Sequence, residues 1–429
     1  DPVAAFERAE PGARMLWLQP EADFAIVGSG FAGRFVGEGL DRFARALAGW
    51  REFSQAALVD ASPGPLPAPL CVGGFSFDPA ARRPGGVWHA FADADLTAPA
   101  VALVRRAGDA WVLLTRRAEP DDDPRGAAKE LTEHLGRLLE PADRDEVGAP
   151  PTADEVRDGA PWREAVREAT EAIGRGALLK VVLAREVVAR ARDSFPVGLT
   201  LRRLREAYRS CVVFAFEREG AVFLGATPER LVRLDGRRVQ AACLAGSRPR
   251  GVTPQEDEAL ASALRADRKE RFEHALVVRA LGDALEPVCD SLVAPGEPEL
   301  LRLRNVQHLY TPVEGVIRDD ANVLDLVARL HPTPAVGGVP REAALAVIRK
   351  SEPFDRGWYA GPVGWVDASG GGEFVVALRS ALLRGGEARL YAGCGVFAVS
   401  DPGREWYESN LKIRAMGWAL NLPASSGEP

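Results

Sequence analysis

The chain has 429 residues, 46% of them apolar and 27% charged, which is the composition of an ordinary globular protein with room for more than one domain. Its net charge of −7 argues against a nucleic-acid partner, and no apolar stretch approaches the about 18 residues of a membrane span. The five cysteines lack metal-site spacing and the N-terminus lacks a signal pattern, so we expect a cytoplasmic protein without zinc or disulfides.

The first block of the chain is rich in short β-like runs. They are separated by glycine and proline and read, in order, ARMLWLQ, FAIVG, LCVGGFSF, GVWHAF, AVALVRR and AWVLLTRR. A helix near 126–140 follows, and residues 141–160 have the proline, glycine and charge of a linker. We therefore divide the chain into an N-terminal β-rich part, 1–150, and a second region, 151–429.

One stretch of this block, VGSGFAG, carries the G-x-G-x-x-G spacing of dinucleotide-binding proteins at Gly28, Gly30 and Gly33. That motif requires a helix directly after the last glycine and an acidic residue at the end of the next strand. Here two more glycines follow, and Glu52 falls inside the next helical pattern, which begins near Leu40. The stretch is better explained as two strands of a β-meander with glycine turns, and no nicotinamide or flavin is expected.

The second region alternates helices with strands and closes in a meander of WYAGPVGWVD, EFVVALRSALLR and ARLYAGCGVF. Sequential strands joined by glycine-rich turns indicate antiparallel pairing. The predicted class is α+β, with large antiparallel sheets and helices packed outside.

Two side chains of this region stand out as acid–base candidates. Lys180 lies in the apolar run LLKVVLAREVVAR, where its amine is either buried or reaches solvent from an edge strand. A buried neutral amine can act as a general base. Glu229 follows Thr227-Pro228 at a bend, which can direct its carboxylate into a cleft or leave it in a solvated turn.

Two helical segments each carry a pair of glutamates at i, i+3. The pairs are Glu270 with Glu273 and Glu405 with Glu408, and each pair projects from one helix face. Together the four carboxylates could form an all-oxygen site for Mg²⁺, although charged helix faces paired with arginine are the common alternative.

Taken together, the motifs of residues 160–420 resemble those of the chorismate-utilising enzymes, which include isochorismate, salicylate, anthranilate and aminodeoxychorismate synthases. The matching stretches, in order, are KVVLAR, GATPERL, LAGSRPRG, KERFEH, VQHLYTPVEG, HPTPAVGG, EPFDRGWYAGPVGW, ALRSA, YAGCGV and REWYESNLK. The form HPTPAVGGVP, from His331 to Pro340, is similar to that of the isochorismate synthases. Ser247 departs from many relatives, which carry threonine there, at a position that helps to set the nucleophile.

The resemblance implies an Mg²⁺-dependent isomerase that adds water at C2 of chorismate and expels the C4 hydroxyl. Alternatives are a salicylate synthase, which also eliminates pyruvate, an ammonia-using anthranilate-type synthase, and a noncatalytic chorismate-binding partner. The resemblance implies Lys180 as the base and Glu229 as the acid. It also implies Mg²⁺ held by Glu273 and Glu408, with Glu270 and Glu405 bound to the ion directly or through water. The implied substrate-binding residues are Gly246, Ser247, Tyr359, Arg379, Gly393, Gly395 and Lys412.

Other properties stay open at this level. His308 and His331 either shape the pocket or are core histidines, and we assign them no chemistry. The sequence does not decide between menaquinone, siderophore and salicylate pathways, nor whether a trace lyase activity is present. We expect a monomer.

Overall fold

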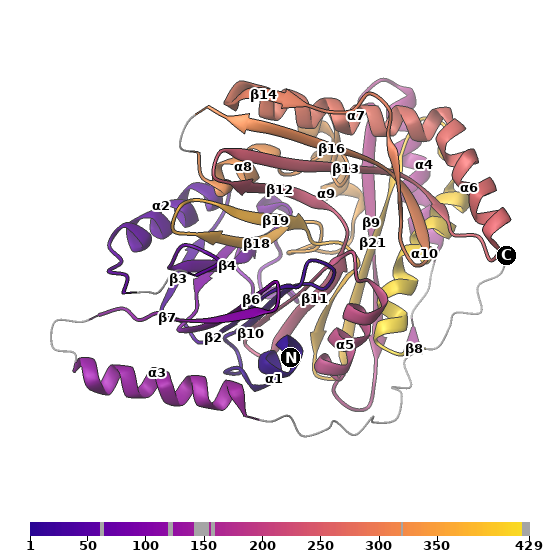
Figure 1. Cartoon of the computed structure of the whole chain (residues 1–429). Helices are drawn as coiled ribbons and strands as arrows, with labels where there is room; N and C mark the ends of the chain where they lie inside the picture. Colours follow the sequence, from indigo (N-terminus) through magenta and orange to yellow (C-terminus); the bar gives the residue numbers. More distant parts are fainter. Residues whose placement is uncertain (61–63, 119–122, 141–153, 156–158, 319–320, 423–429) are drawn as a thin grey trace.

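The computed structural model describes residues 1–60, 64–118, 123–140, 154–155, 159–318 and 321–422. These residues form two large antiparallel sheets that pack face to face, with helices on their outer sides and ends (Figure 1). The predicted α+β class is therefore confirmed. Among the described residues, no helix is both long and apolar enough to cross a membrane.

Each sheet takes strands from both ends of the chain. The larger sheet has 11 strands, in spatial order β17 (Gly338–Val339), β9 (Lys180–Arg190), β21 (Glu387–Val396), β20 (Ser380–Arg384), β11 (Ala221–Thr227), β10 (Val212–Arg218), β1 (Arg14–Gln19), β2 (Phe24–Ser29), β6 (Val101–Arg106) and β7 (Asp109–Leu114), with β8 (Asp154–Glu155) beside β9. The smaller sheet has 10 strands, in spatial order β14 (Cys289–Val293), β16 (Val306–Ile317), β13 (Arg238–Pro249), β12 (Arg230–Asp235), β19 (Gly372–Val376), β18 (Pro362–Asp367), β4 (Leu70–Phe75), β5 (Ala94–Ala98) and β3 (Gly33–Gly37), with β15 (Glu299–Arg302) beside β16.

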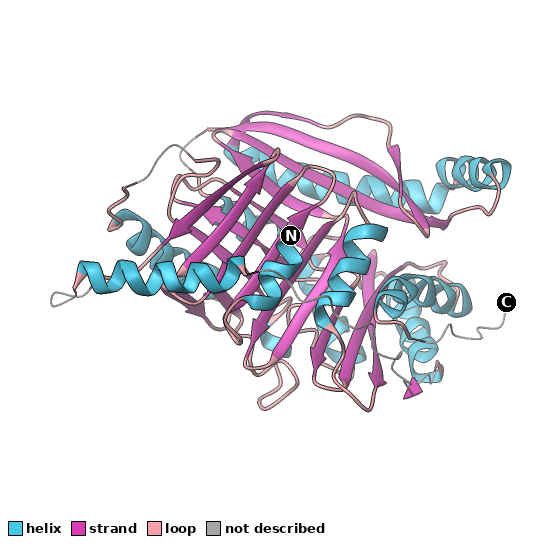
Figure 2. Cartoon of the chain, turned by 60° about the horizontal axis from the view of Figure 1, so that its bottom comes forward, coloured by secondary structure: helices cyan, strands magenta, loops and turns pink. Residues whose placement is uncertain are grey.

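The helices cover the outer sides of the sheets. They are α1 (Pro2–Arg8), α2 (Arg42–Gln55), α3 (Pro124–Leu139), α4 (Ala160–Gly174), α5 (Val197–Ala207), α6 (Pro254–Ala266), α7 (Arg268–Leu285), α8 (Val323–Leu330), α9 (Arg341–Ser351) and α10 (Pro402–Ala419), with 3-10 turns η1 (Pro79–Ala81) and η2 (Glu286–Val288). Figure 2 shows helices lying across one face of the larger sheet. Helices α6 and α7 pack on β13 and β16, and α10 packs on β21.

The central strands are buried on both faces. In β1, Met15 and Trp17 point into the core between the sheets, whereas Leu16 and Leu18 point into a second core under α1, α5 and α10. Because side chains alternate along a strand, a strand with two buried faces has a continuous apolar run such as MLWL.

The chain passes from one sheet to the other at several places, and two of these crossings are hydrogen-bonded to each other. Strand β11 of the larger sheet continues through Pro228 and Glu229 into β12 of the smaller sheet. Strand β19 of the smaller sheet continues through residues 377–379 into β20 of the larger sheet. The two crossings are paired, since Val376 N donates to Glu229 O at 2.9 Å and Ala226 N donates to Arg379 O at 3.2 Å.

Several strand predictions need correction. The stretch EFVVALRSALLR is two strands, β19 and β20, because Arg379 takes a left-handed φ of +47° and the strand breaks there. The two strands around Gly30 form no meander with each other, because β2 lies in the larger sheet and β3 in the smaller one. Gly30 itself lies in the turn between them, with φ of +71°.

The run GVWHAF is not a strand but a series of turns that places Trp88 and Phe91 in the core. Strand β5 was not predicted, because its polar residues Asp95 and Thr97 gave it the composition of a loop. The predicted linker and the boundary at 150 fall largely on residues 141–153 and 156–158, outside the described residues.

A buried ion pair joins the two sheets. Arg218 of β10 donates from Nε to Asp95 Oδ2 of β5 at 2.8 Å and from Nη2 to Thr97 Oγ1 at 3.0 Å, and neither charged side chain is exposed above 2%. Burial acts to raise the pKa of Asp95, but Arg218 and Arg34 outweigh it and hold the pKa below its usual value.

We predict that Asp95→Ala lowers the free energy of unfolding by about 3–5 kcal/mol, because it leaves the Arg218 guanidinium buried without its partner. Urea unfolding at neutral pH measures this. The matched control is Asp290→Ala, which removes an exposed pair with Arg237 and should change stability by less than about 1 kcal/mol. Equal effects of the two substitutions would contradict the prediction.

Candidate active site

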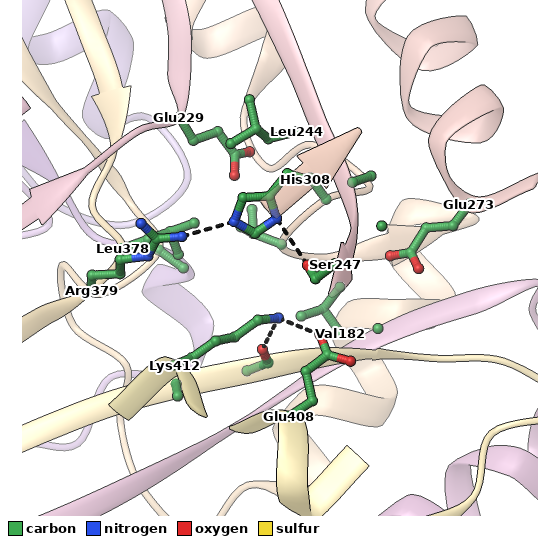
Figure 3. Close-up of a pocket in the computed structure, with 18 of the residues that line it drawn as sticks. Val182, Glu229, Leu244, Ser247, Glu273, His308, Leu378, Arg379, Glu408 and Lys412 are labelled. Carbon is green, nitrogen blue, oxygen red and sulfur yellow. Dashed lines mark hydrogen bonds and ion pairs between the residues drawn. The ribbon is translucent and has the colours of Figure 1, made fainter. Parts of the chain in front are cut away.

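A central cavity lies where the two sheets meet at the crossings (Figure 3). It is lined by Val182, Pro228, Glu229, Leu244, Ala245, Gly246, Ser247, Lys269, Glu270, Glu273, His308, Ala335, Val336, Arg356, Tyr359, Ala360, Leu378, Arg379, Tyr391, Ala392, Gly393, Gly395, Glu408 and Lys412. A larger outer groove shares part of this wall and extends along α10. The cavity thus gathers residues from β9, β13, β16, β21, α7, α10 and both crossings.

Of the predicted site residues, all but two line this cavity. Lys180 lies behind the wall and is completely buried, with Nζ 2.8 Å from Glu273 Oε1. Glu405 lines the outer groove instead of the cavity. Lys180 is therefore not the solvated edge-strand lysine that the sequence also allowed.

Glu229 is held at the first crossing. Pro228 precedes it, and its own N–H donates to Thr227 Oγ1 at 3.2 Å, so that the bend is fixed locally. The residue is only 6% exposed. Burial raises the pKa of Glu229 to about 7, although Lys180, Lys412 and Arg379 act in the opposite direction. This carboxyl group can therefore carry a proton near neutral pH.

Arg379 lies at the second crossing and leads a chain of hydrogen bonds. Its Nη2 lies 2.8 Å from His308 Nε2, and His308 Nδ1 lies 2.9 Å from Ser247 Oγ (Figure 3). Burial lowers the pKa of His308 well below its usual value, which makes the ring neutral. Because a guanidinium can only donate, Nε2 accepts and the ring proton sits on Nδ1. The Ser247 hydroxyl accepts that proton's hydrogen bond and keeps its own hydrogen for the cavity.

Gly246 makes a bulge in β13. The pairing with β16 shifts between Ala245 and Ser247, and Gly246 has φ of +83°, a conformation that glycine adopts without strain. The bulge turns the Ser247 N–H toward Glu270 Oε2, at 3.2 Å.

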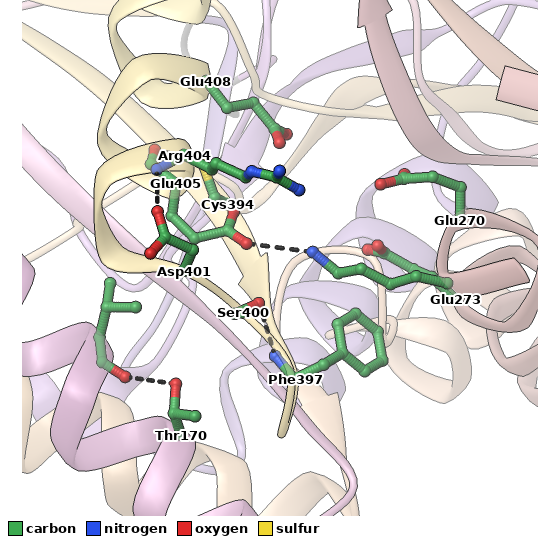
Figure 4. A network of polar contacts seen from close by, with 12 residues as sticks. Thr170, Glu270, Glu273, Cys394, Phe397, Ser400, Asp401, Arg404, Glu405 and Glu408 are labelled. Carbon is green, nitrogen blue, oxygen red and sulfur yellow. Dashed lines mark hydrogen bonds and ion pairs between the residues drawn. The ribbon is translucent and has the colours of Figure 1, made fainter. Parts of the chain in front are cut away.

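The four glutamates lie in the first two turns of α7 and α10. Both helices are capped by aspartate, with Asp267 accepting from Lys269 N at 2.9 Å and Asp401 accepting from Arg404 N at 2.9 Å. Figure 4 shows Glu270 and Glu273 facing Glu405 and Glu408 across a gap between the two helices. The positive ends of two helix dipoles thus meet at the carboxylates.

Lysine ammonium groups contact three of these carboxylates. The pairs are Lys180 with Glu273 at 2.8 Å, Lys269 with Glu405 at 3.1 Å and Lys412 with Glu408 at 2.8 Å. Among the described residues, Glu270 has no such partner within 4.0 Å. Burial and the neighbouring Glu273 and Glu408 raise the pKa of Glu270 to about 7.

This donor set fits a hard divalent cation. Four carboxylates supply only oxygen, which Mg²⁺ prefers, and the burial and crowded negative charge that raise the pKa of Glu270 would both be offset by such an ion. One oxygen each of Glu405 and Glu408 also lies within 4.8 Å of the other and of Cys394 Sγ. Burial raises the pKa of Cys394 well above its usual value, so this residue is a thiol and a poor ligand for Mg²⁺.

The remaining predicted residues of the cavity wall are Tyr359, Gly393, Gly395 and Lys412. Lys412 Nζ donates to Gly393 O at 2.9 Å, and a Cβ on Gly393 would lie 3.3 Å from the Tyr359 hydroxyl. The Tyr359 ring stacks on Tyr391, with ring centroids 5.1 Å apart. The side-chain-free surface of Gly393 leaves room beside this stack.

Sequence reasoning did not single out Lys269 or the role of His308. The signal for Lys269 was its place directly before Glu270 in KERFEH, where a cation follows a helix cap. His331 is a core histidine that lies outside the cavity wall, with Nε2 3.0 Å from Phe77 O. All five cysteines are free and buried.

The geometry can be set beside known proteins. Residues 1–421 match the chorismate binding enzyme family. The chain is 36% identical to isochorismate synthase MenF of Bacillus subtilis, over 98% of this chain and 91% of that protein. It is 42% identical to the salicylate biosynthesis isochorismate synthase of Pseudomonas aeruginosa, over 95% and 84%. The structure of the menaquinone-specific isochorismate synthase MenF of Escherichia coli superposes with a TM-score of 0.81 at 27% identity, covering 98% of this chain and 91% of that chain.

The wall in front of Lys180 depends on Gly395. A Cβ at this position would lie 2.6 Å from Glu273 Oε1 and 3.1 Å from Lys180 Cε. We predict that Gly395→Ala forces this ion pair apart and lowers the free energy of unfolding by about 1–3 kcal/mol.

Urea unfolding in the presence of a chelator measures this effect. Gly282→Ala in α7 is the control, because a Cβ there meets nothing within 4 Å and should stabilise the helix by about 0.5–1 kcal/mol. A Gly395→Ala protein as stable as the parent would contradict the close packing.

Proposed function

Because the chain belongs to the chorismate binding enzyme family, we propose that it is an isochorismate synthase, an isomerase that converts chorismate to isochorismate. One observation carries the proposal: the carboxyl group of Glu229, whose pKa is near neutral, lines the cavity, and the buried amine of Lys180 lies behind the wall of the same cavity, against Glu273. The same cavity presents Arg379 and Lys412, cations suited to a dicarboxylate.

The reaction adds water at C2 of the ring, moves the double bonds and expels hydroxide from C4. Lys180 is the proposed base, which takes a proton from the attacking water when its side chain is the neutral amine. Its Cε lies 3.1 Å from the position that a Cβ of Gly395 would occupy, so a residue without a side chain stands between Lys180 and the cavity. The contact with Glu273 fixes the position of Nζ within the wall.

Glu229 is the proposed acid, which gives its proton to the departing hydroxide so that water leaves. Burial keeps this carboxyl group protonated in part at neutral pH, which the role requires. Each of the two proton transfers is worth about 10²- to 10⁴-fold in rate.

The four glutamates would hold Mg²⁺, with Glu273 and Glu408 as the nearest ligands and Glu270 and Glu405 direct or through water. The ion supplies charge neutralisation for the ring carboxylate of the substrate. The residues of the chain carry out the proton transfers and bind the rest of the substrate.

Arg379, Lys412 and Tyr359 would hold the pyruvyl carboxylate. The hydrogen-bond chain through His308 keeps the Ser247 hydroxyl turned toward the substrate as a donor. Gly246, Gly393 and Gly395 would let backbone groups approach substrate oxygens closely.

We also propose that the enzyme acts as a cytoplasmic monomer, since one chain supplies every group named here. The pathway that consumes its product is a separate matter, because the names of the two curated relatives and the solved structure include both salicylate and menaquinone routes.

Product analysis tests the proposal. Purified protein incubated with chorismate and Mg²⁺ should yield isochorismate, and excess EDTA should stop the conversion. Salicylate and pyruvate would indicate that elimination follows, and an aminated product with ammonium would indicate an anthranilate-type synthase. A chain that consumes no chorismate with Mg²⁺ present would be a noncatalytic binding partner.

The proposed roles of Lys180 and Glu229 predict that removing either group lowers kcat to a similar extent. Lys180→Ala and Glu229→Gln should each lower kcat by about 10²- to 10⁴-fold while chorismate still binds. Lys350→Ala removes an exposed lysine and should leave kcat unchanged. Near-parental turnover by Lys180→Ala would remove this lysine as the base.

The pKa of Glu229 also determines whether kcat rises or falls with pH. The acid must be protonated, so kcat should fall as pH rises through about 7. A kcat profile of the parent enzyme at saturating chorismate and Mg²⁺ measures this limb. Flat activity from about pH 6 to about pH 8 would contradict the role of Glu229.

A further inference from the structure

Lys269 is a charged group of the cavity to which the proposed reaction gives no task. It lies in the first turn of α7, between the cap Asp267 and Glu270, and its side chain is 29% exposed. Its Nζ lies 3.1 Å from Glu405 Oε1, a carboxylate only 3% exposed, and the dashed line in Figure 4 marks this contact. The same Nζ lies 5.8 Å from the centre of the Phe397 ring.

We propose that Lys269 is a positioning residue that holds Glu405 in place of a metal ion and thereby sets the affinity of the site for Mg²⁺. The inference rests on the proposed function, because it takes the four glutamates as the metal site. It concerns a residue of the cavity wall that takes no part in the proposed proton transfers.

The surroundings of Lys269 support this role. Lys180 and Lys412 also contact site glutamates, but each has a further place in the cavity: Lys180 behind Gly395, and Lys412 on Gly393 O. Among the described residues, Lys269 has Glu405 as its only ion-pair partner within 4.0 Å. Its ammonium group therefore serves the glutamate cluster alone.

The effect on metal binding follows from charge. An ammonium group inside a half-buried cluster of carboxylates repels a divalent cation, and the repulsion is stronger there than in water. Glu405 must also give up Lys269 before it can turn to the ion. Removing the ammonium group should therefore make Mg²⁺ bind more tightly, whereas damage to the fold would weaken binding.

Lys269→Met is the sharpest substitution. Methionine keeps most of the apolar stem against Phe397 and removes the charge, and the helix cap uses the backbone N–H of residue 269, which is retained. Lys269→Arg keeps the positive charge at this position. Arg271→Met on the same helix is the matched control, since Arg271 has an exposed ion pair with Glu297 at 2.9 Å.

The measurement is calorimetric titration of the full-length protein with MgCl₂, without chorismate. We expect the Kd for Mg²⁺ to fall by about tenfold or more in Lys269→Met and to stay close to the parental value in Lys269→Arg and Arg271→Met. The melting temperature supplies a second readout: Lys269→Met should melt lower than the parent in EDTA and gain more from Mg²⁺.

Unchanged or weaker Mg²⁺ binding by Lys269→Met, with normal binding by the parent, would overturn the inference and leave the proposed function intact. If the parent binds no Mg²⁺, the inference falls together with the metal site, and the chorismate assay shows separately whether the activity survives. Should Lys269→Met fail to fold, Lys269→Gln tests the same loss of charge.

Discussion

The paired crossing of two strands between the sheets is the constraint on which the cavity depends. At this point neither sheet can satisfy the backbone alone, so the two segments hydrogen-bond to each other: Val376 N to Glu229 O, Ala226 N to Arg379 O, and Thr227 Oγ1 to Val376 O at 2.7 Å. Because each crossing fixes the other, the side chains that leave the strands here have defined directions. Glu229 and Arg379 are those side chains, and the left-handed backbone of Arg379 is tolerated because its neighbours are held on both sides.

Charge balance inside the cavity follows from that geometry. Four carboxylates at the starts of α7 and α10 would repel one another strongly at low dielectric, and lysines from β9, α7 and α10 contact three of them. Glu270, which has no lysine within 4.0 Å among the described residues, is the one whose pKa rises to about 7. Glu229 reaches a similar pKa, and burial is the largest cause for both groups: neighbouring carboxylates add to it at Glu270, whereas at Glu229 it outweighs three nearby cations. The cavity thus holds two carboxyl groups whose pKa values lie near neutral pH.

The sequence predicted the type of most elements and 11 of the 24 residues that line the cavity, because these leave local patterns or belong to the motifs of the family. Short apolar runs predicted the strands, and the glutamates at i, i+3 predicted two helix faces. What it missed depends on distant partners. The polar residues Asp95 and Thr97 lie in a strand because Arg218 of the other sheet compensates them, and the break at Arg379 depends on the crossing beside it. The ion pair of Lys269 with Glu405 joins residues 136 positions apart, and no spacing in the sequence encodes that contact.

The tautomer of His308 determines which groups on this part of the cavity wall donate hydrogen bonds. Since Arg379 can only donate, His308 must accept at Nε2 and donate at Nδ1, and Ser247 is left with its own hydrogen. Arg379 and Ser247 therefore present donors to the cavity, and the glutamates of α7 and α10 present acceptors, one of which, Glu408, already pairs with Lys412. A dicarboxylate can place one acid group on the donors directly, but it can meet the glutamates only through a cation. In the proposed reaction, the two acid groups of the substrate are held by different means, which would fix the ring between them in one orientation relative to Lys180 and Glu229.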